Sequence, residues 1–320
     1  MNPRPLYALI LALLLAPAVC AQKKTQVDAN KFALIINGAG GDQAYAKQFE
    51  QWTTQLRSAL SDRYGFDTQN VVVLQNAKAT DVKSTFAKLG TQLDATNVLF
   101  VFLIGHGSYD GKEAKFNLVG PDLSASEYNA LLSSLPTKRI VLYNMASASG
   151  EFVKSLSAKG RIIITATKSG QETNATRFAG FFIAALNAKD ADTDQDGHTS
   201  VLETFVYANR LTADFYTRAG RLATEHALLE DNGDGVGREK AEAGEGLLAR
   251  ATYLDSLSMD QAAASVATGR LLKERTRLEA EIEQLIARKA NMPEAEYEAT
   301  LERLFIQLAK VNRSIKQAGS

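Results

Sequence analysis

Cysteine is almost absent from this chain of 320 residues, which has only Cys20. A single cysteine cannot form an intramolecular disulfide, so the stability of the fold must come from its core and from any metal it binds. A charge imbalance is also absent, because 36 basic residues are matched by 36 acidic ones. A neutral chain offers no electrostatic reason to bind nucleic acid or an anionic membrane surface, and we expect neither.

Near the N-terminus, the apolar run Leu6–Ala16 is too short to span a bilayer, because a membrane helix needs ~20 apolar residues. Arg4 precedes this run, and small residues follow it up to Ala21, as in a secretory signal peptide. We therefore expect residues 1–21 to be cleaved. The mature chain would then begin at Gln22, contain no cysteine and no transmembrane segment, and be exported to the periplasm or secreted.

Cys20 allows a second interpretation, the lipid-modified cysteine of a bacterial lipoprotein. The residue before such a cysteine is normally small, whereas here it is the β-branched Val19. The sequence therefore favours plain cleavage, with lipidation at Cys20 as the alternative.

Between Lys31 and about Leu186, short apolar runs alternate with stretches of helical spacing. Runs that are apolar on every side and separated by helices indicate a parallel sheet covered on both faces, an α/β fold. The predicted strands are Phe32–Ile36, Val71–Leu74, Val98–Ile104, Ile140–Tyr143 and Ile162–Ala166.

Candidate catalytic side chains follow two of these strands. His106 stands between Gly105 and Gly107, where an imidazole can act as a general base and a glycine leaves room for a substrate backbone. Ser147 lies after the next strand, in a turn that opens a helix, beside main-chain amides that could stabilise an oxyanion. In a parallel sheet both positions belong at the carboxyl edge, which is the arrangement of a two-residue hydrolytic dyad.

The order of these motifs resembles the caspase/legumain clan of cysteine peptidases, and most closely its bacterial legumain-like members. The strand that ends in Gly105-His106-Gly107 is similar to the His-Gly motif of the clan, and the turn Ser147-Ala148-Ser149-Gly150 is similar to its Cys-x-Ser-Gly motif. The resemblance covers roughly residues 31–186. It implies a caspase/legumain-like fold, with the next strand and the substrate-pocket loop in Arg161–Gly170 and the following helix at Phe178–Leu186, and polypeptide as the substrate or partner.

The chain departs from the clan at the nucleophile. The cysteine position falls on Ser147, and the mature chain has no cysteine to replace it. A serine hydroxyl needs far stronger activation than a thiol, whose free pKa is about 8.5. We therefore expect a degenerate dyad in a pseudopeptidase that binds a peptide or a protein partner. The alternative is an active endopeptidase that uses Ser147 and His106.

The twelve residues 192–203 match an EF-hand calcium loop. Aspartates occupy positions 1, 3 and 5, glycine position 6, serine position 9 and glutamate position 12, and the residue at position 7 would contribute its backbone carbonyl. The sequence therefore predicts a Ca²⁺ site. Its ligands would be Asp192, Asp194, Asp196, His198, Ser200 and Glu203.

A second acidic segment, residues 230–235, matches half of such a loop. Arg238 and Ala241 stand where further ligands should be. The segment is as compatible with a tight acidic turn as with a second ion.

The C-terminal region has a different pattern. Residues 31–237 form the expected α/β domain, residues 238–258 a linker, and residues 259–318 two helices that turn near Pro293 into an antiparallel hairpin. This hairpin is either a pair that packs on itself or an arm for self-association or partner binding. An assembly protein that works through the hairpin alone is a third candidate function.

Overall fold

The computed structural model describes residues 27–241, 245–255, 266–289 and 292–318. The expected signal peptide, residues 1–21, lies outside these ranges, and so does the expected first residue of the mature chain. Parts of the expected linker and hairpin, residues 256–265 and 290–291, lie outside them as well.

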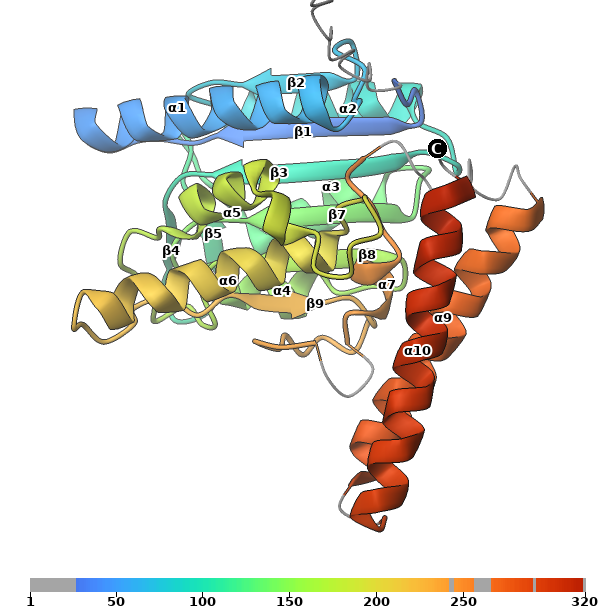
Figure 1. Ribbon diagram of the computed structural model, residues 1–320. Coiled ribbons are helices and arrows are strands. Elements are labelled where there is room, and N and C mark those ends of the chain that lie inside the picture. Colours follow the sequence, from blue (N-terminus) through green and yellow to red (C-terminus); the bar gives the residue numbers. More distant parts are fainter. Residues whose placement is uncertain (1–26, 242–244, 256–265, 290–291, 319–320) are drawn as a thin grey trace, which may run out of the picture.

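A six-stranded sheet forms the centre of the protein, with strand order β2-β1-β3-β7-β8-β9 (Figure 1). The first five strands in this order pair in parallel, and only β9 is antiparallel. The expectation of an α/β fold with a mostly parallel sheet is confirmed. The strands are β1 (Lys31–Asn37), β2 (Val71–Leu74), β3 (Val98–Ile104), β7 (Arg139–Asn144), β8 (Arg161–Thr165) and β9 (Leu228–Glu230).

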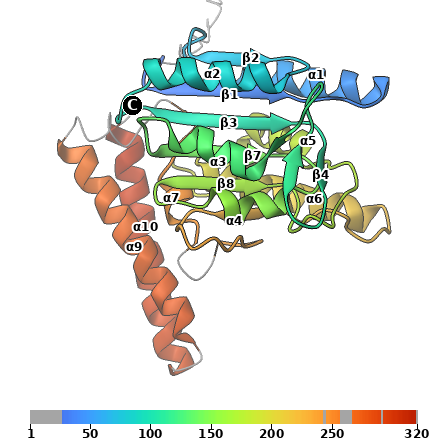
Figure 2. The same ribbon diagram turned by 180° about the vertical axis from the view of Figure 1, so that it is seen from behind.

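Helices cover both faces of this sheet. One face carries α1 (Gln43–Ser58), α5 (Phe178–Asn187) and α6 (Val201–Arg218), as Figure 1 shows. The other carries α2 (Ala79–Gln92), α3 (Ala125–Ser133) and α4 (Phe152–Leu156), seen in Figure 2.

Each covered face has its own hydrophobic cluster, and the side chains of β3 alternate between the two. Phe100 and Phe102 point to the α1/α5/α6 face, whereas Leu99 and Val101 point to the other. All seven residues of β3 are buried. Burying one such side chain contributes ~1.5–3 kcal/mol, so the central strand holds the strand ends in fixed positions.

A small antiparallel sheet follows β3 directly, with strand order β4-β5-β6. Its strands are β4 (Gly107–Tyr109), β5 (Ala114–Phe116) and β6 (Leu123–Ser124). His106 therefore lies in the short connection between the two sheets, and β4 is an edge strand.

The segment expected as a linker carries the short helix α7 (Leu247–Arg250). Leu229 bridges to Arg238, and Ser200 bridges to Tyr253, so this segment runs along the α/β domain. Ala249 and Leu254 are buried in the hydrophobic cluster of the α1/α5/α6 face.

The last two helices are α9 (Val266–Ala287) and α10 (Glu294–Ala318). They lie side by side and extend beyond the α/β body in both views (Figures 1 and 2). A separate hydrophobic cluster joins them, formed by Leu278, Ile282, Leu285, Tyr297 and Leu304. Among the helices that are described, none combines the length and the apolar character needed to cross a bilayer.

Candidate functional site

The two expected dyad residues lie at the carboxyl ends of neighbouring strands. Ser147 follows β7 and is 3% exposed, and its hydroxyl makes two hydrogen bonds with Gly107. The Ser147 Oγ donates to the Gly107 carbonyl at 3.0 Å and accepts from the Gly107 N–H at 3.1 Å. A side chain at Gly107 would collide with the Ser147 carbonyl at 2.3 Å, which explains the glycine.

The His106 imidazole packs on aromatic rings instead of on the serine. Its ring centroid lies 4.8 Å from that of Tyr45 and 5.1 Å from that of Phe49, both in edge-on contacts from α1. Within the part of the chain that the structure describes, no hydrogen bond joins this imidazole to Ser147. The structure thus brings the two residues to one edge of the sheet without linking them.

The turn after Ser147 is strained and firmly held. Ala148 has a left-handed backbone with φ 53°, which is unfavourable for a residue with a Cβ, and its N–H donates to the Glu172 carbonyl at 2.8 Å. The Ser149 hydroxyl accepts from the N–H of Thr167 at 3.2 Å, and the Gly150 N–H donates to the Thr167 hydroxyl at 3.0 Å. These bonds fasten the turn to the loop that follows β8.

A carboxylate–imidazole contact that the sequence analysis missed holds this loop from the other side. The Glu172 carboxylate contacts the His226 ring and accepts the N–H of Lys168 at 2.9 Å. Glu172 and His226 are separated by 54 residues. No local spacing links them, so the pair could not be recognised in the sequence.

The expected calcium loop places three carboxylates together. One oxygen from each of Asp192, Asp194 and Asp196 lies within 4.8 Å of the others, and the group could hold a metal ion. Gln195 and Gly197 have left-handed backbones, with φ 55° and 87°, and so wrap the loop tightly around these side chains. Hard oxygen donors in such a tight loop fit calcium, although the cluster by itself does not distinguish calcium from other cations.

Glu203, at position 12, closes the loop from the first turn of α6. Its Oε1 accepts the N–H of Thr193 at 2.8 Å, and its Oε2 accepts the N–H of Ser200 at 2.9 Å. The Ser200 hydroxyl in turn accepts the Glu203 N–H at 3.2 Å, which completes a capping box. Position 12 therefore faces the loop interior, while the Ser200 side chain caps the helix.

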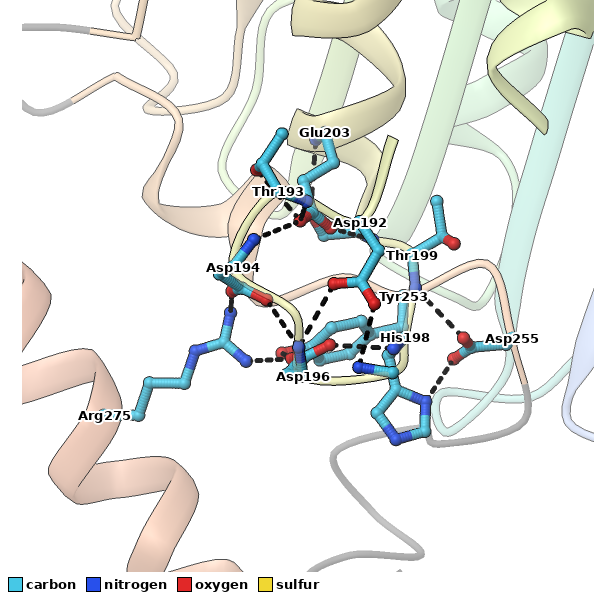
Figure 3. A network of polar contacts seen from close by, with 12 residues as sticks. Asp192, Thr193, Asp194, Asp196, His198, Thr199, Glu203, Tyr253, Asp255 and Arg275 are labelled. Carbon is cyan, nitrogen blue, oxygen red and sulfur yellow. Dashed lines mark hydrogen bonds and ion pairs between the residues drawn. The ribbon is translucent and has the colours of Figure 1, made fainter. Parts of the chain in front are cut away.

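Figure 3 shows that Arg275 extends from α9 to the loop and meets Asp194 and Asp196 from one side. The guanidinium bonds to Asp194 at 2.5 Å and also pairs with Asp196. Burial raises the pKa of Asp194; Arg275 lowers it, and the neighbouring carboxylates of Asp196 and Glu203 raise it again. One guanidinium thus does not balance the negative charge gathered here.

The loop pairs with residues 252–255 and not with a second loop of its own kind. The Leu254 N–H donates to the Thr199 carbonyl at 2.9 Å, and the Thr199 N–H donates to the Asp255 carboxylate at 3.0 Å. Asp255 also lies 3.2 Å from the His198 ring. Burial lowers the pKa of His198, but the hydrogen bond and charge of Asp255 outweigh it and raise that pKa overall.

In the second acidic segment the carboxylates are used for internal bonds. Asp231 accepts the N–H groups of Gly246 and Ala249 at 2.8 and 2.7 Å, at the start of α7. Arg238 pairs with Asp234 at 2.8 Å and with the buried Glu245. These bonds form a tight acidic turn braced by an arginine, whereas Glu230 Oε2 is buried without a hydrogen-bond partner among the described residues.

The dyad and the calcium loop lie at opposite ends of the sheet. Lys31, the first residue of β1, donates to the Leu254 carbonyl at 3.1 Å and to that of Asp255, so the loop and its partner segment lie at the amino ends of the strands. Ser147 and Gly107 lie at the carboxyl ends. A metal in the loop would therefore be remote from the dyad.

Comparisons with known proteins include a distant likeness to a solved structure. No protein-family model matches the chain, and no curated protein matches it. Among solved structures, the crystal structure of protein GSU0716 from Geobacter sulfurreducens is similar with a TM-score of 0.43 and 13% identity. The match covers 63% of this chain and 92% of that one.

Proposed function

We propose that this protein is an exported, calcium-binding relative of the caspase/legumain clan whose dyad is degenerate and whose strand-end site binds polypeptide without cleaving it. The observation that carries the proposal is the bonding of the Ser147 hydroxyl, which donates one hydrogen bond to the main chain of Gly107 and accepts another from it. A serine held in this way is not activated by a base. The His106 imidazole, packed on Tyr45 and Phe49, is the base that would have to move.

The edge strand β4 supports polypeptide binding. The main chain of His106 and Asp110, at the two ends of β4, hydrogen-bonds to the strand opposite. Because bonded and non-bonded residues alternate along an antiparallel pair, the main-chain groups of Gly107 and Tyr109 point away from β5. Ser147 covers those of Gly107. An extended peptide that adds to this edge would pair with Tyr109 and displace the Ser147 hydroxyl.

In this proposal the metal has a structural role. Calcium bound at residues 192–203 would tie α6 to the segment at 252–255, far from the strand-end site.

Export is tested separately: N-terminal sequencing of the secreted protein should give Gln22 as the first residue, and a diacylglyceryl group on Cys20 would contradict it.

One observation favours the alternative of an active endopeptidase. Strained backbone conformations such as that of Ala148 cluster at active sites, and Ala148 directly follows Ser147. If Ser147 and His106 act as a unit, Ser147→Ala and His106→Ala should each abolish cleavage to a similar extent.

A peptide-library assay on the chain from Gln22 separates the two functions. We expect peptides to be retained but not cleaved. Retention should fall in Tyr109→Pro, which removes one outward N–H from the edge, and persist in the matched control Tyr109→Phe. Ser147→Cys should gain weak cleavage if His106 is still within reach. Robust cleavage by the unmodified chain, lost in Ser147→Ala, would refute the proposal.

A further inference from the structure

Arg275 binds two of the carboxylates that the expected calcium loop would offer to an ion. It comes from α9, is nine-tenths buried or more, and lies 5.7 Å from the ring centroid of Tyr253 in the segment paired with the loop. Its two terminal nitrogens contact Asp194 and Asp196, as Figure 3 shows. A buried cation is thus already paired with two of the three clustered carboxylates of the loop.

Arg275 uses the same oxygens that an ion would need. In Asp194 and Asp196, Oδ1 accepts a main-chain N–H from within the loop, at 3.1 and 2.8 Å, and Oδ2 faces the guanidinium. Positions 3 and 5 of an EF-type loop ligate calcium through their carboxylates. Arg275 holds the Oδ2 atoms of both carboxylates, so calcium binding at positions 3 and 5 has to compete with these ion pairs.

In the part of the chain that the structure describes, the arm, formed by α9 and α10, packs mainly on itself. The hydrophobic cluster of the arm contains none of the residues of the two clusters of the body. Between arm and body lies a cavity of about 800 Å³, which α6 and the loop line on one side and Ile282, Ile286 and Phe305 on the other. Beside this cavity, the Arg275 ion pairs attach the arm to the loop.

We infer that calcium and Arg275 exclude each other from residues 192–203, so that calcium releases the arm and opens the cavity beneath it. This inference rests on the calcium loop of the proposed function. Coupling of this kind is reciprocal: a released arm must also raise the affinity of the loop for calcium. The surface exposed on release would include the apolar side chains Val206, Ile286 and Phe305, which are already about half exposed.

Calcium titration of the chain from Gln22 tests the competition, with terbium luminescence or calorimetry as the readout. Arg275→Gln removes the competitor and should tighten calcium binding about tenfold if the arm is docked in nine of ten molecules. Arg275→Lys keeps the positive charge but loses the planar guanidinium, and its calcium affinity should lie between that of the wild type and that of Arg275→Gln. Arg277→Gln is the matched control, because Arg277 is exposed and pairs with Glu274 and Glu281 on its own helix.

Hydrogen exchange of peptides from α9 supplies the second readout. Calcium should speed exchange in the wild type, whereas Arg275→Gln should exchange fast with or without calcium. Equal affinities in the wild type and Arg275→Gln, with unchanged exchange, would overturn the inference and leave the calcium site intact. A chain that binds no calcium in any variant would overturn the site itself, and the inference with it.

Discussion

Ser147 illustrates how main-chain geometry decides the role of a side chain. Its hydroxyl is buried against Gly107, whose N–H and carbonyl are left outward by the pairing of β4 with β5. Sequence analysis could place His106 and Ser147 at neighbouring strand ends, because that follows from the parallel sheet. It could not show the bonds of the hydroxyl, because β4 is only three residues long and has no periodicity of its own.

Because the hydroxyl of the buried Ser147 bonds to the part-buried N–H of Gly107, Ser147→Ala should destabilise the protein. Leaving a fully buried donor without a partner costs ~1–3 kcal/mol, so we expect a loss at the lower end of that range. Urea unfolding of the chain from Gln22 measures this cost, with Ser84→Ala as the control, since Ser84 is exposed and bonds only within its own helix. A stability equal to that of the wild type would mean that the Ser147 bonds contribute nothing net.

Lys31 makes stability depend on pH in the alkaline range. Burial lowers its pKa to about 8, and the nearby Asp28, 3.7 Å away, only partly offsets this. Between pH 8 and 10 the unfolded chain binds more protons at this lysine than the folded chain, so the free energy of unfolding should rise with pH. Lys31→Met should flatten that slope in denaturant titrations. If the free energy of unfolding of Lys31→Met rises with pH as steeply as that of the exposed control Lys88→Met, the pH dependence does not come from Lys31.

At the scale of elements, the long buried strands and α6 were predictable because each carries many apolar residues in one regular pattern. The cluster of Asp192, Asp194 and Asp196 could be anticipated for a different reason, since these residues are close in sequence; that it binds calcium stays a prediction. The strands β4, β5, β6 and β9 are two or three residues long, too short to show a period. The pairing of Thr199 with residues 252–255 was also beyond reach, because it joins segments far apart in the chain.

Calcium should raise the melting temperature through the loop at residues 192–203. An ion that binds only the folded state stabilises it by ~2.7 kcal/mol at a hundredfold excess over the dissociation constant. Glu203→Gln should remove most of this gain, because position 12 supplies two ligand oxygens. Asp234→Asn, in the second acidic segment, is the matched control and should keep the full response. If a chelator leaves the melting temperature of the wild type unchanged, residues 192–203 form only an acidic turn.

At the scale of the whole molecule, the two candidate sites lie at opposite ends of one rigid sheet, and the arm is attached beside the calcium loop. The contacts that create this arrangement are remote in sequence: Arg275 is 79 residues from Asp196, and Lys31 is 223 residues from Leu254. Neither residue has a local pattern that marks its partner. The sequence predicted the arm as a pair of helices, but the attachment of the arm is a tertiary feature.

The separate hydrophobic cluster of the arm implies that the arm can loosen without the α/β body. Leu304 is 3% exposed in that cluster, and truncating a buried leucine costs ~2–5 kcal/mol, whereas Ile306 on the same helix is 48% exposed. Leu304→Ala should therefore lower hydrogen-exchange protection in α9 and α10 while β3 stays protected, and Ile306→Ala should change neither. Loss of protection in β3 as well would show that the arm and the body unfold as one unit. The same control variant also tests self-association. If the exposed face that contains Ile306 mediates a dimer, Ile306→Ala should weaken that dimer, and sedimentation analysis would detect a shift towards monomer.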